Sequence, residues 1–365
     1  MEKQTISVRV PATVGNFGGA ADCGSLALDA SLNVKVTRRH DGQVSIRYFG
    51  EDGERVPRDR SNLVVRAIEA ALHSKQRQFT GADLEIYSSV PVAVGLGSST
   101  AAVLAGLISA NLLYRLELDE KSLFDLGAIY ENRGGNLRAA WSGGFVACVE
   151  DASRMSPGAA ERTALVYERT SVPENFVLSV VVPETFLVGG ARSVGAGQSA
   201  GSIGKPARQG KRTSGRTRGS ESGRFLGRHA EKEIALRLNR AAALAEFFAQ
   251  QGSGHSIELD APLPPTCEKN VAGLEDALRV RMPGLLSVFV CGSGPAVGVF
   301  AAENAADAGR AVRQAFAKHN VESSSFEFRP SNMGAVDWNA AYRDLTLPLS
   351  QGLGDVVRKS SPLPV

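Results

Sequence analysis

A glycine- and serine-rich segment is the strongest candidate for a site that binds an anion. Residues 91–101 read PVAVGLGSSTA, and an apolar stretch suited to a buried helix follows directly. Glycines let backbone N–H groups come close to an anion, and the first N–H groups of a helix have no partners within it. The hydroxyls of Ser98, Ser99 and Thr100 could bond phosphate oxygens or bind Mg²⁺. The alternative is an ordinary strand-to-helix turn with a serine cap.

Two other glycine-rich segments lie far from the first in the sequence. Residues 11–29 read PATVGNFGGAADCGSLALD, and residues 291–296 read CGSGPA between two apolar stretches. Segment 91–101 does not end in Gly-Lys-Ser/Thr, so it is not a P-loop of the Walker type. A function that uses all three segments requires a fold that brings them together.

Alternating and apolar patterns predict the elements around these segments. Strands are predicted over residues 5–10, 24–37, 44–49, 84–90, 143–150, 176–183, 285–290, 296–300 and 323–329. Helices are predicted over residues 61–75, 100–116, 120–131, 229–250 and 304–318, with Ser61 or Asn62 near the start of the first. Interleaved strands and helices indicate a mixed α/β or α+β fold, and the second half suggests a ferredoxin-like arrangement.

Length and composition fit a globular protein of two domains. The 365 residues are 43% hydrophobic and 22% charged, which excludes collagen-like, coiled-coil and fully disordered chains. The four scattered cysteines form no CxxC pair, so we expect neither a zinc knuckle nor a disulfide framework. The first residues lack the apolar core of a signal peptide, and the longest apolar run is too short to span a bilayer. We therefore expect a cytoplasmic protein with no membrane partner.

Residues 195–228 differ from the rest of the chain. They contain nine Gly, five Ser, eight Lys or Arg and one Glu, a composition that cannot build a core. We interpret them as a flexible, solvated insert, with contact to an anionic substrate or a nucleic acid as the alternative. The formal net charge of the whole chain is only +3, so we expect no nucleic-acid partner. Residues 346–365 are predicted to be a loose tail.

In this order, the three glycine-rich segments resemble the motifs of the GHMP small-molecule kinases. Segment 11–29 is most similar to the homoserine kinase pattern, roughly Pro-Ala-Thr-x-x-Asn-Leu-Gly-x-Gly-x-Asp-x-x-Gly-x-Ala-Leu. The resemblance covers about residues 5–345. It implies ATP-dependent phosphorylation of the hydroxyl of a small metabolite, here L-homoserine to O-phospho-L-homoserine in threonine biosynthesis. The alternatives are a GHMP kinase for another alcohol and a degenerate nucleotide-binding homologue without kinase activity.

The resemblance also implies an α+β fold of the GHMP kinase type. Its N-terminal domain is similar to domain 2 of ribosomal protein S5, and its C-terminal domain is ferredoxin-like. We expect a nucleotide-binding domain over residues 1–168 and the second domain over residues 174–345, with the active site between them. The resemblance leaves open whether the protein forms a homodimer.

For the nucleotide and the metal, the resemblance implies individual residues. ATP phosphates are expected on residues 95–100 and adenine near Ser61 and Asn62. The expected cofactor-binding residues are Asn62, Pro91, Gly95, Leu96, Gly97, Ser98, Ser99, Thr100 and Ala101. Mg²⁺ is expected on Ser99 and on Glu131 at the end of the helix over residues 120–131, since two protein oxygens suffice when phosphates supply the rest. The alternative for Glu131 is a solvated acid at a helix end.

For the phosphoacceptor, the resemblance implies contacts with Asn16, Asp22, Asn136, Arg192, Gly292, Ser293 and Gly294. Asp22 is expected to hold the amino or hydroxyl group and is, with Ser99 and Glu131, one of three expected catalytic residues. Asp22 as a general base is the weaker alternative, because phosphoryl transfer depends mainly on positioning and charge neutralisation. Asn16 and Asp22 could also be simple turn residues.

Some residues depart from the family pattern. Arg133 and Gly135 stand in a predicted turn where His and Asp are usual. Only Lys269 is cationic where a second carboxylate-binding Arg is expected, and a Lys offers a point charge in place of a bidentate fork. Cys291 and Ala296 replace Ser and Thr, and Cys291 is either a reactive thiol or an inert buried residue. These departures favour the alternative of a different alcohol.

Overall fold

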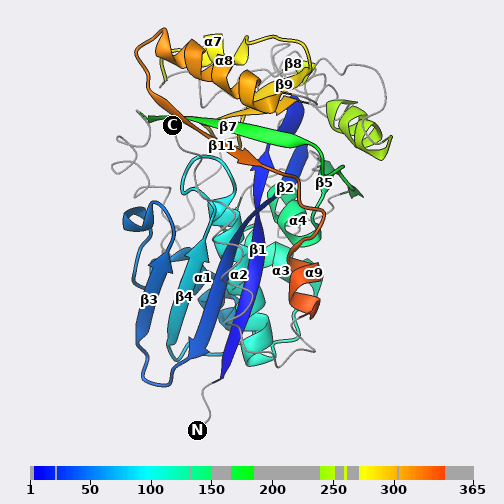
Figure 1. Cartoon of the computed structure of the whole chain (residues 1–365). Helices are drawn as coiled ribbons and strands as arrows, with labels where there is room; N and C mark the ends of the chain where they lie inside the picture. The colour runs from blue at the N-terminus through cyan, green and yellow to red at the C-terminus, as the bar shows by residue number, and fades with distance from the viewer. Residues whose placement is uncertain are drawn as a thin grey trace, which may run out of the picture.

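Two β-sheets, one from each half of the chain, form the framework of the protein (Figure 1). The computed structural model describes residues 4–20, 23–131, 134–149, 166–184, 239–250, 259–260, 271–301 and 304–341. The insert over residues 195–228 and the tail over residues 346–365, both predicted from composition, lie outside these ranges. No helix in the described part of the chain is long and apolar enough to cross a membrane.

The first sheet is organised around one long strand. Strand β2 (Gly24–Arg38) pairs with β1 (Thr5–Gly15) on one side and with β4 (Ala82–Ser88) and β5 (Phe145–Val149) on the other. Strands β3 (Val44–Phe49) and β6 (Val166–Thr170) complete the order β3-β4-β2-β5-β6. Its buried side chains pack against the helices α1 (Leu63–Ser74), α2 (Ser98–Tyr114), α3 (Glu120–Gly127) and α4 (Gly134–Ser142). Asn62 caps α1, as predicted.

Strand β1 runs five residues further than the pattern over residues 5–10 predicts. Its register with β2 shifts between Pro11 and Thr13, so that Pro11 pairs with Ser31 and Thr13 with Ala27. Proline has no N–H to give to a ladder, which is why it is tolerated at such an irregularity. Residues 13–15 of the first glycine-rich segment are therefore held in a strand.

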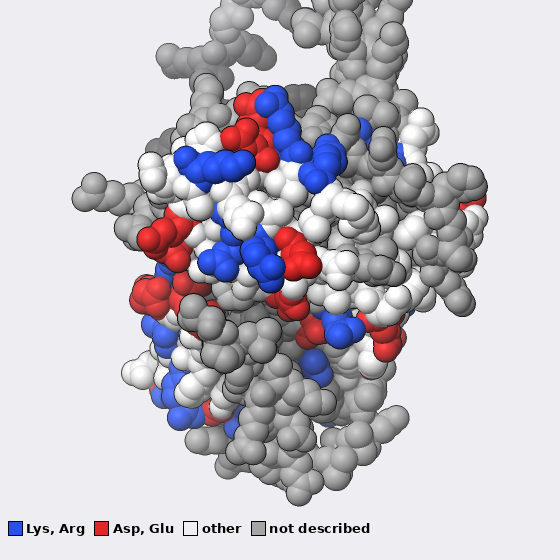
Figure 2. Space-filling model, turned by 45° about the horizontal axis from the view of Figure 1, so that its top comes forward, with Lys and Arg blue, Asp and Glu red and all other residues white. Residues whose placement is uncertain are grey.

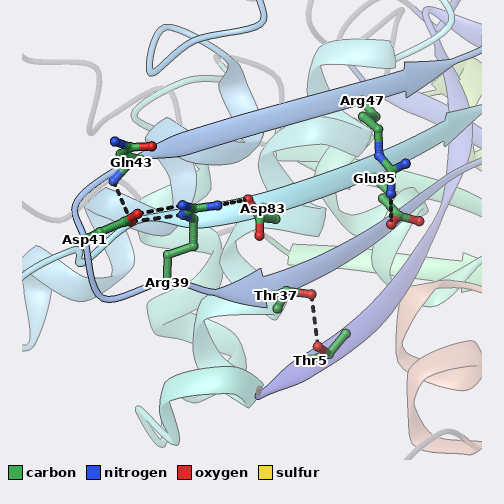
Figure 3. A network of polar contacts seen from close by, with 8 residues as sticks. All are labelled: Thr5, Thr37, Arg39, Asp41, Gln43, Arg47, Asp83 and Glu85. Carbon is green, nitrogen blue, oxygen red and sulfur yellow. Dashed lines mark hydrogen bonds and ion pairs between the residues drawn. The ribbon is translucent and has the colours of Figure 1, made fainter. Parts of the chain in front are cut away.

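Charged side chains pair across the strands of the first sheet near one of its edges (Figure 3). Arg39 donates to Asp83 at 2.7 Å and to both carboxylate oxygens of Asp41 at 2.9 and 2.6 Å. Arg47 on β3 pairs with Glu85 on β4. The Arg39 guanidinium holds the pKa of Asp41 well below its usual range. These groups are exposed, so the pairs mark a water-facing side and contribute little to stability.

The second sheet confirms the predicted ferredoxin-like arrangement. Its strands are β7 (Val177–Pro183), β8 (Leu259–Asp260), β9 (Leu285–Val290), β10 (Val297–Ala301) and β11 (Ser323–Phe328), in the order β11-β7-β10-β9-β8. Apart from β8, neighbouring strands are antiparallel. Helices α7 (Leu274–Leu278) and α8 (Ala305–Ala317) cover one face. Seen from this end, basic and acidic side chains are interspersed among the described residues (Figure 2).

The opposite face of the second sheet joins the first sheet through an aromatic core. Phe17, which follows β1, is fully buried. Its ring lies 4.9 to 6.1 Å from the rings of Phe145, Phe248, Phe289 and Phe300, which come from both sheets and from a helix over residues 239–249. Ring pairs at such distances add to the free energy gained from burial. Phe17 therefore ties the two halves together beside the first glycine-rich segment.

After β11 the chain returns to the first sheet (Figure 1). The N–H of Ser331 donates to the carbonyl of Ala27 at 2.9 Å. Helix α9 (Ala335–Ala341), which the sequence pattern did not predict, lies against β1. There Asn339 exchanges hydrogen bonds with the backbone of Arg9, and the Arg9 guanidinium lies 4.0 Å from the ring centroid of Trp338. The expected division into domains over residues 1–168 and 174–345 stays a prediction.

The prediction of one helix over residues 120–131 is wrong. Helix α3 ends at Gly127, whose carbonyl accepts the N–H groups of both Tyr130 and Glu131 at 3.0 Å. The N–H of Glu131 thus still makes a bond of helical spacing, to the residue four before it, but residues 128–131 do not continue the helix. A separate helix, α4, starts at Gly134, although two glycines open it and glycine is a poor helix former. Packing against the first sheet outweighs that local preference.

We expect Phe17→Ala to lower the free energy of unfolding by about 3–5 kcal/mol, because it leaves a cavity between several buried rings. Urea-induced unfolding measures this loss. Phe49→Ala is the control: Phe49 is 44% exposed and stacks only on Tyr87 among the ring pairs described, so its loss should be about 1 kcal/mol or less. Equal losses in the two variants would contradict a junction held by Phe17.

Candidate active site

The loop over residues 91–97 leads into the N-terminus of α2. The side chains of Val94 and Leu96 are buried in the aromatic junction. Gly97 precedes the helix with φ of +66°, and no side chain caps it. The N–H of Ala101 is the first to bond back, to the carbonyl of Gly97 at 2.9 Å. The N–H groups before it are orphans of the helix, and with the helix dipole they make a site for an anion.

The three glycine-rich segments meet at this loop through backbone hydrogen bonds. The N–H of Thr13 donates to the carbonyl of Leu96 at 3.2 Å, which joins the first and second segments. The N–H of Gly292 donates to the carbonyl of Gly15 at 3.0 Å, which joins the third segment to the first. The amide of Asn16 adds a buried bond, from Nδ2 to the carbonyl of Gly292 at 2.6 Å. Asn16 and Gly292 are 276 residues apart in the sequence, so distant segments form one loop cluster.

Two positions in the second segment accept only glycine. Gly95 has φ of +93°, and a Cβ there would lie 2.1 Å from the carbonyl oxygen of Cys291. Gly97 has φ of +66°, and a Cβ there would lie 2.2 Å from the hydroxyl oxygen of Thr13. Both contacts are closer than real atoms can approach. The glycines serve the packing of the loop against its neighbours, which holds its N–H groups in place.

Glu131 lies opposite the start of α2. Its Oε2 accepts hydrogen bonds from the hydroxyls of Ser99 at 3.2 Å and Thr100 at 2.6 Å. Ser99 is exposed and Glu131 is partly exposed, so a ligand can reach both. The two residues expected to hold Mg²⁺ therefore lie together, although Glu131 is in a turn beyond the helix.

Asn136 lies in the first turn of α4, where the sequence predicted a turn outside any helix. It is 6% exposed, and its Oδ1 accepts a hydrogen bond from the hydroxyl of Ser25 at 2.9 Å. A Cβ on Gly15 would lie 2.7 Å from the same oxygen. Asn136 thus packs under the end of β1, close to the contact between Gly15 and Gly292.

Other predicted site residues have different places in the structure. Asn62 is 3% exposed; its Oδ1 accepts from the N–H of Val64 and its Nδ2 donates to the carbonyl of Pro57. Both polar atoms of Asn62 thus serve the start of α1, and a contact with adenine stays a prediction. Asp22 and Arg192 lie outside the described residues, as do Arg133 and Lys269 among the departures from the family pattern.

The structure resolves the two interpretations of Cys291. Its side chain is fully buried, and burial raises the pKa of the thiol well above its ordinary value. A thiol held in its protonated form is a poor nucleophile. Cys291 therefore fits the inert interpretation, and its backbone carbonyl packs against Gly95.

Sequence reasoning missed two residues that support the site. Thr13 contacts Gly97, and Asp52 anchors the loop by accepting the N–H of Val92 at 3.3 Å. Thr13 stands within the first glycine-rich segment, so its position was a usable signal. Asp52 is 40 residues from Val92 in a turn after β3, and no local pattern marks it.

The residues present fit a nucleotide and a divalent cation. The orphan N–H groups and the loop over residues 95–97, here called the glycine cradle, suit phosphate. The oxygens of Ser99 and Glu131 are hard ligands that suit Mg²⁺. Among the described residues, no group of three or more His, Cys, Asp and Glu side chains gathers to hold a metal. A cation between Ser99 and Glu131 would therefore need phosphates and water as further ligands.

Gly95→Ala should lower the free energy of unfolding by more than Gly42→Ala does. Gly42 has a similar positive φ of +74° but nothing within 4 Å of an added Cβ, so it isolates the backbone strain of about 1–2 kcal/mol. Gly95→Ala adds the clash with the Cys291 carbonyl. Urea-induced unfolding of both variants measures the difference, and equal losses would refute the close contact of these two segments.

Comparisons with known proteins agree with this geometry. Residues 62–144 match the GHMP kinases N-terminal domain. The chain is 31% identical to a homoserine kinase of Persephonella marina over 181 residues, which is half of this chain and 56% of that protein. It is 26% identical to a homoserine kinase of Aquifex aeolicus over 317 residues, 86% of this chain and 92% of that protein. The crystal structure of a homoserine kinase from Cytophaga hutchinsonii, at 21% identity, has the same fold, with a TM-score of 0.57 over 92% of this chain and 97% of that one. Residues 62–144 therefore match the N-terminal domain of the GHMP kinases, and the described chain has the GHMP kinase fold.

Proposed function

We propose that this protein is a homoserine kinase, which transfers the γ-phosphoryl group of ATP to the side-chain hydroxyl of L-homoserine. The assignment as a phosphotransferase rests on Ser99 and Glu131. They lie together beside the N-terminus of α2 and the glycine cradle, with 3.2 Å between Ser99 Oγ and Glu131 Oε2. The similarity to homoserine kinases of Aquifex aeolicus and Persephonella marina supports homoserine as the acceptor.

The chain's contribution to the transfer is electrostatic and geometric. The N–H groups at the start of α2 hold phosphate oxygens, and the packed loop keeps those donors fixed. Ser99 Oγ and the Glu131 carboxylate hold Mg²⁺, which when bound neutralises charge on the phosphates. No side chain has to form a covalent intermediate in such a reaction, because positioning and charge stabilisation provide most of the rate enhancement.

The acceptor site is formed by the contact of the first and third segments. The bond from Asn16 to the carbonyl of Gly292 holds that contact, and Asn136 supports the end of β1 beneath it. Asp22 and Arg192 are proposed from the sequence alone: Asp22 holds the ammonium or hydroxyl group of homoserine, and Arg192 holds its carboxylate. A carboxylate and a guanidinium match the opposite charges of an amino acid.

We expect Ser99→Ala and Glu131→Ala each to lower kcat by about 10²–10³-fold, the range for removing a group that stabilises charge in a transition state. Melting temperatures should change little, since both side chains lie at the open end of the site. A coupled assay of ADP release measures kcat.

Asp125→Ala is the matched control. Asp125 is the neighbouring acid on α3 and pairs with Lys121 on the same helix at 2.7 Å. This variant should keep wild-type turnover. Full activity in Glu131→Ala together with an inactive Asp125→Ala would show that the metal ligand was assigned to the wrong acid.

The acceptor is tested by ADP release across a panel of amino alcohols and phosphorylated alcohols. Homoserine should give the highest kcat/KM, with weak binding, because a single guanidinium holds its carboxylate less firmly than two would; the loss of one charge-assisted hydrogen bond corresponds to about one to two decades in affinity. Another alcohol is the second candidate, favoured by Lys269 in place of an Arg. ADP release with that alcohol and none with homoserine would contradict homoserine as the acceptor and leave only the broader assignment as a kinase.

A further inference from the structure

We propose that Thr100 is a positioning residue that acts through Glu131 and does not bind phosphate itself. The inference rests on the proposed function, because it assigns a role toward the metal-binding carboxylate. From the sequence alone, Thr100 had the same expected role as Ser98 and Ser99. The structure separates Thr100 from both serines by its burial, and from Ser99 also by its shorter bond to Glu131.

The hydroxyl of Thr100 is directed at Glu131. Its Oγ1 lies 2.6 Å from Glu131 Oε2, within the range of short, charge-assisted O–H···O⁻ bonds. Thr100 is fully buried, whereas Ser99 beside it is exposed and lies 3.2 Å from the same oxygen. The exposed hydroxyl can turn to a metal ion, and the buried one holds the carboxylate in place.

The backbone acceptors that usually compete for such a hydroxyl are already engaged. A threonine within a helix often bonds the carbonyl three or four residues before it. For Thr100 these carbonyls belong to Gly97 and Leu96. They accept the N–H groups of Ala101 at 2.9 Å and Thr13 at 3.2 Å. The Thr100 hydroxyl has one proton to donate, and its bond to Glu131 Oε2 replaces such a local bond.

Glu131 needs such a partner because its own backbone element does not orient it. It follows the end of α3, where its N–H bonds the carbonyl of Gly127. A glutamate side chain has three torsions whatever the backbone around it, and a metal ligand must be held in one orientation. Thr100 sits on a rigid, buried helix, so the bond transfers that rigidity to the carboxylate.

The test compares the isosteric Thr100→Val, which removes the hydroxyl, with Thr100→Ser, which keeps it. Binding of Mn²⁺ at saturating ADP is followed by electron paramagnetic resonance, and binding of ADP without metal by calorimetry. We expect Thr100→Val to weaken Mn²⁺ binding about 10- to 100-fold, the usual cost of removing a partner of a metal ligand. Thr100→Ser should restore it, and metal-free ADP affinity should stay at the wild-type value in both variants.

Ser109→Ala is the control, since Ser109 is a buried hydroxyl of the same helix away from the loop cluster. Its Mn²⁺ affinity should match the wild type. Wild-type Mn²⁺ affinity in Thr100→Val would overturn the inference. So would an equal loss of metal-free ADP affinity, which would make Thr100 a phosphate ligand. If instead the wild type binds Mn²⁺ with ADP but phosphorylates no alcohol in the panel, the proposed function fails while the comparison of variants still decides the role of Thr100.

Discussion

Residues 95–97 lie against residues 13–15 and 291–292 at backbone-to-backbone distance, and the rest of the site depends on this contact. Two glycines with positive φ make it possible, because any Cβ at Gly95 or Gly97 would overlap a neighbour. The contact buries the apolar side chains of the loop and fixes its backbone directly before the first turn of α2. The aromatic core around Phe17 stabilises the same junction from below. The contact of these three segments therefore contributes both to the stability of the fold and to the proposed anion site.

The electrostatics of the site follow from where α2 begins. A buried 17-residue helix directs its dipole at the loop, and its first N–H groups are unpaired within the helix. The acid opposite them, Glu131, would be repelled by a phosphate unless a cation lay between the two. The pairing of a glutamate with the hydroxyls of Ser99 and Thr100 thus supports the proposed site for metal and phosphate. This is the chemistry required of a phosphotransferase of the GHMP family.

The sequence patterns predicted the features of the fold that depend on interactions between residues close together in the chain. Most strands of both sheets, the ferredoxin-like arrangement and the Asn62 cap of α1 follow from alternation, apolar runs and capping chemistry, whereas strands β6 and β8 were not predicted. The end of α3 at Gly127 was not predicted, although glycine is a poor helix former, and the start of α4 at Gly134 could not be predicted, because packing against the first sheet sets it against helix propensity. The anchoring of the loop by Asp52 and the bond from Thr100 to Glu131 join residues 40 and 31 apart, and no periodicity encodes such contacts. For Ser99 and Glu131 the resemblance to a family predicted that the two residues lie together, and the structure adds which atoms meet.

A crystal structure with a non-hydrolysable ATP analogue and Mg²⁺ tests the central claim most directly, namely that the three glycine-rich segments form one phosphate site at the start of α2. The account predicts electron density for phosphate oxygens within hydrogen-bond distance of the N–H groups at residues 97–100. It also predicts a cation between Ser99 Oγ and the Glu131 carboxylate, with Thr100 still bonded to Glu131. Phosphates bound away from α2, or a cation with Glu131 turned away from it, would contradict the account.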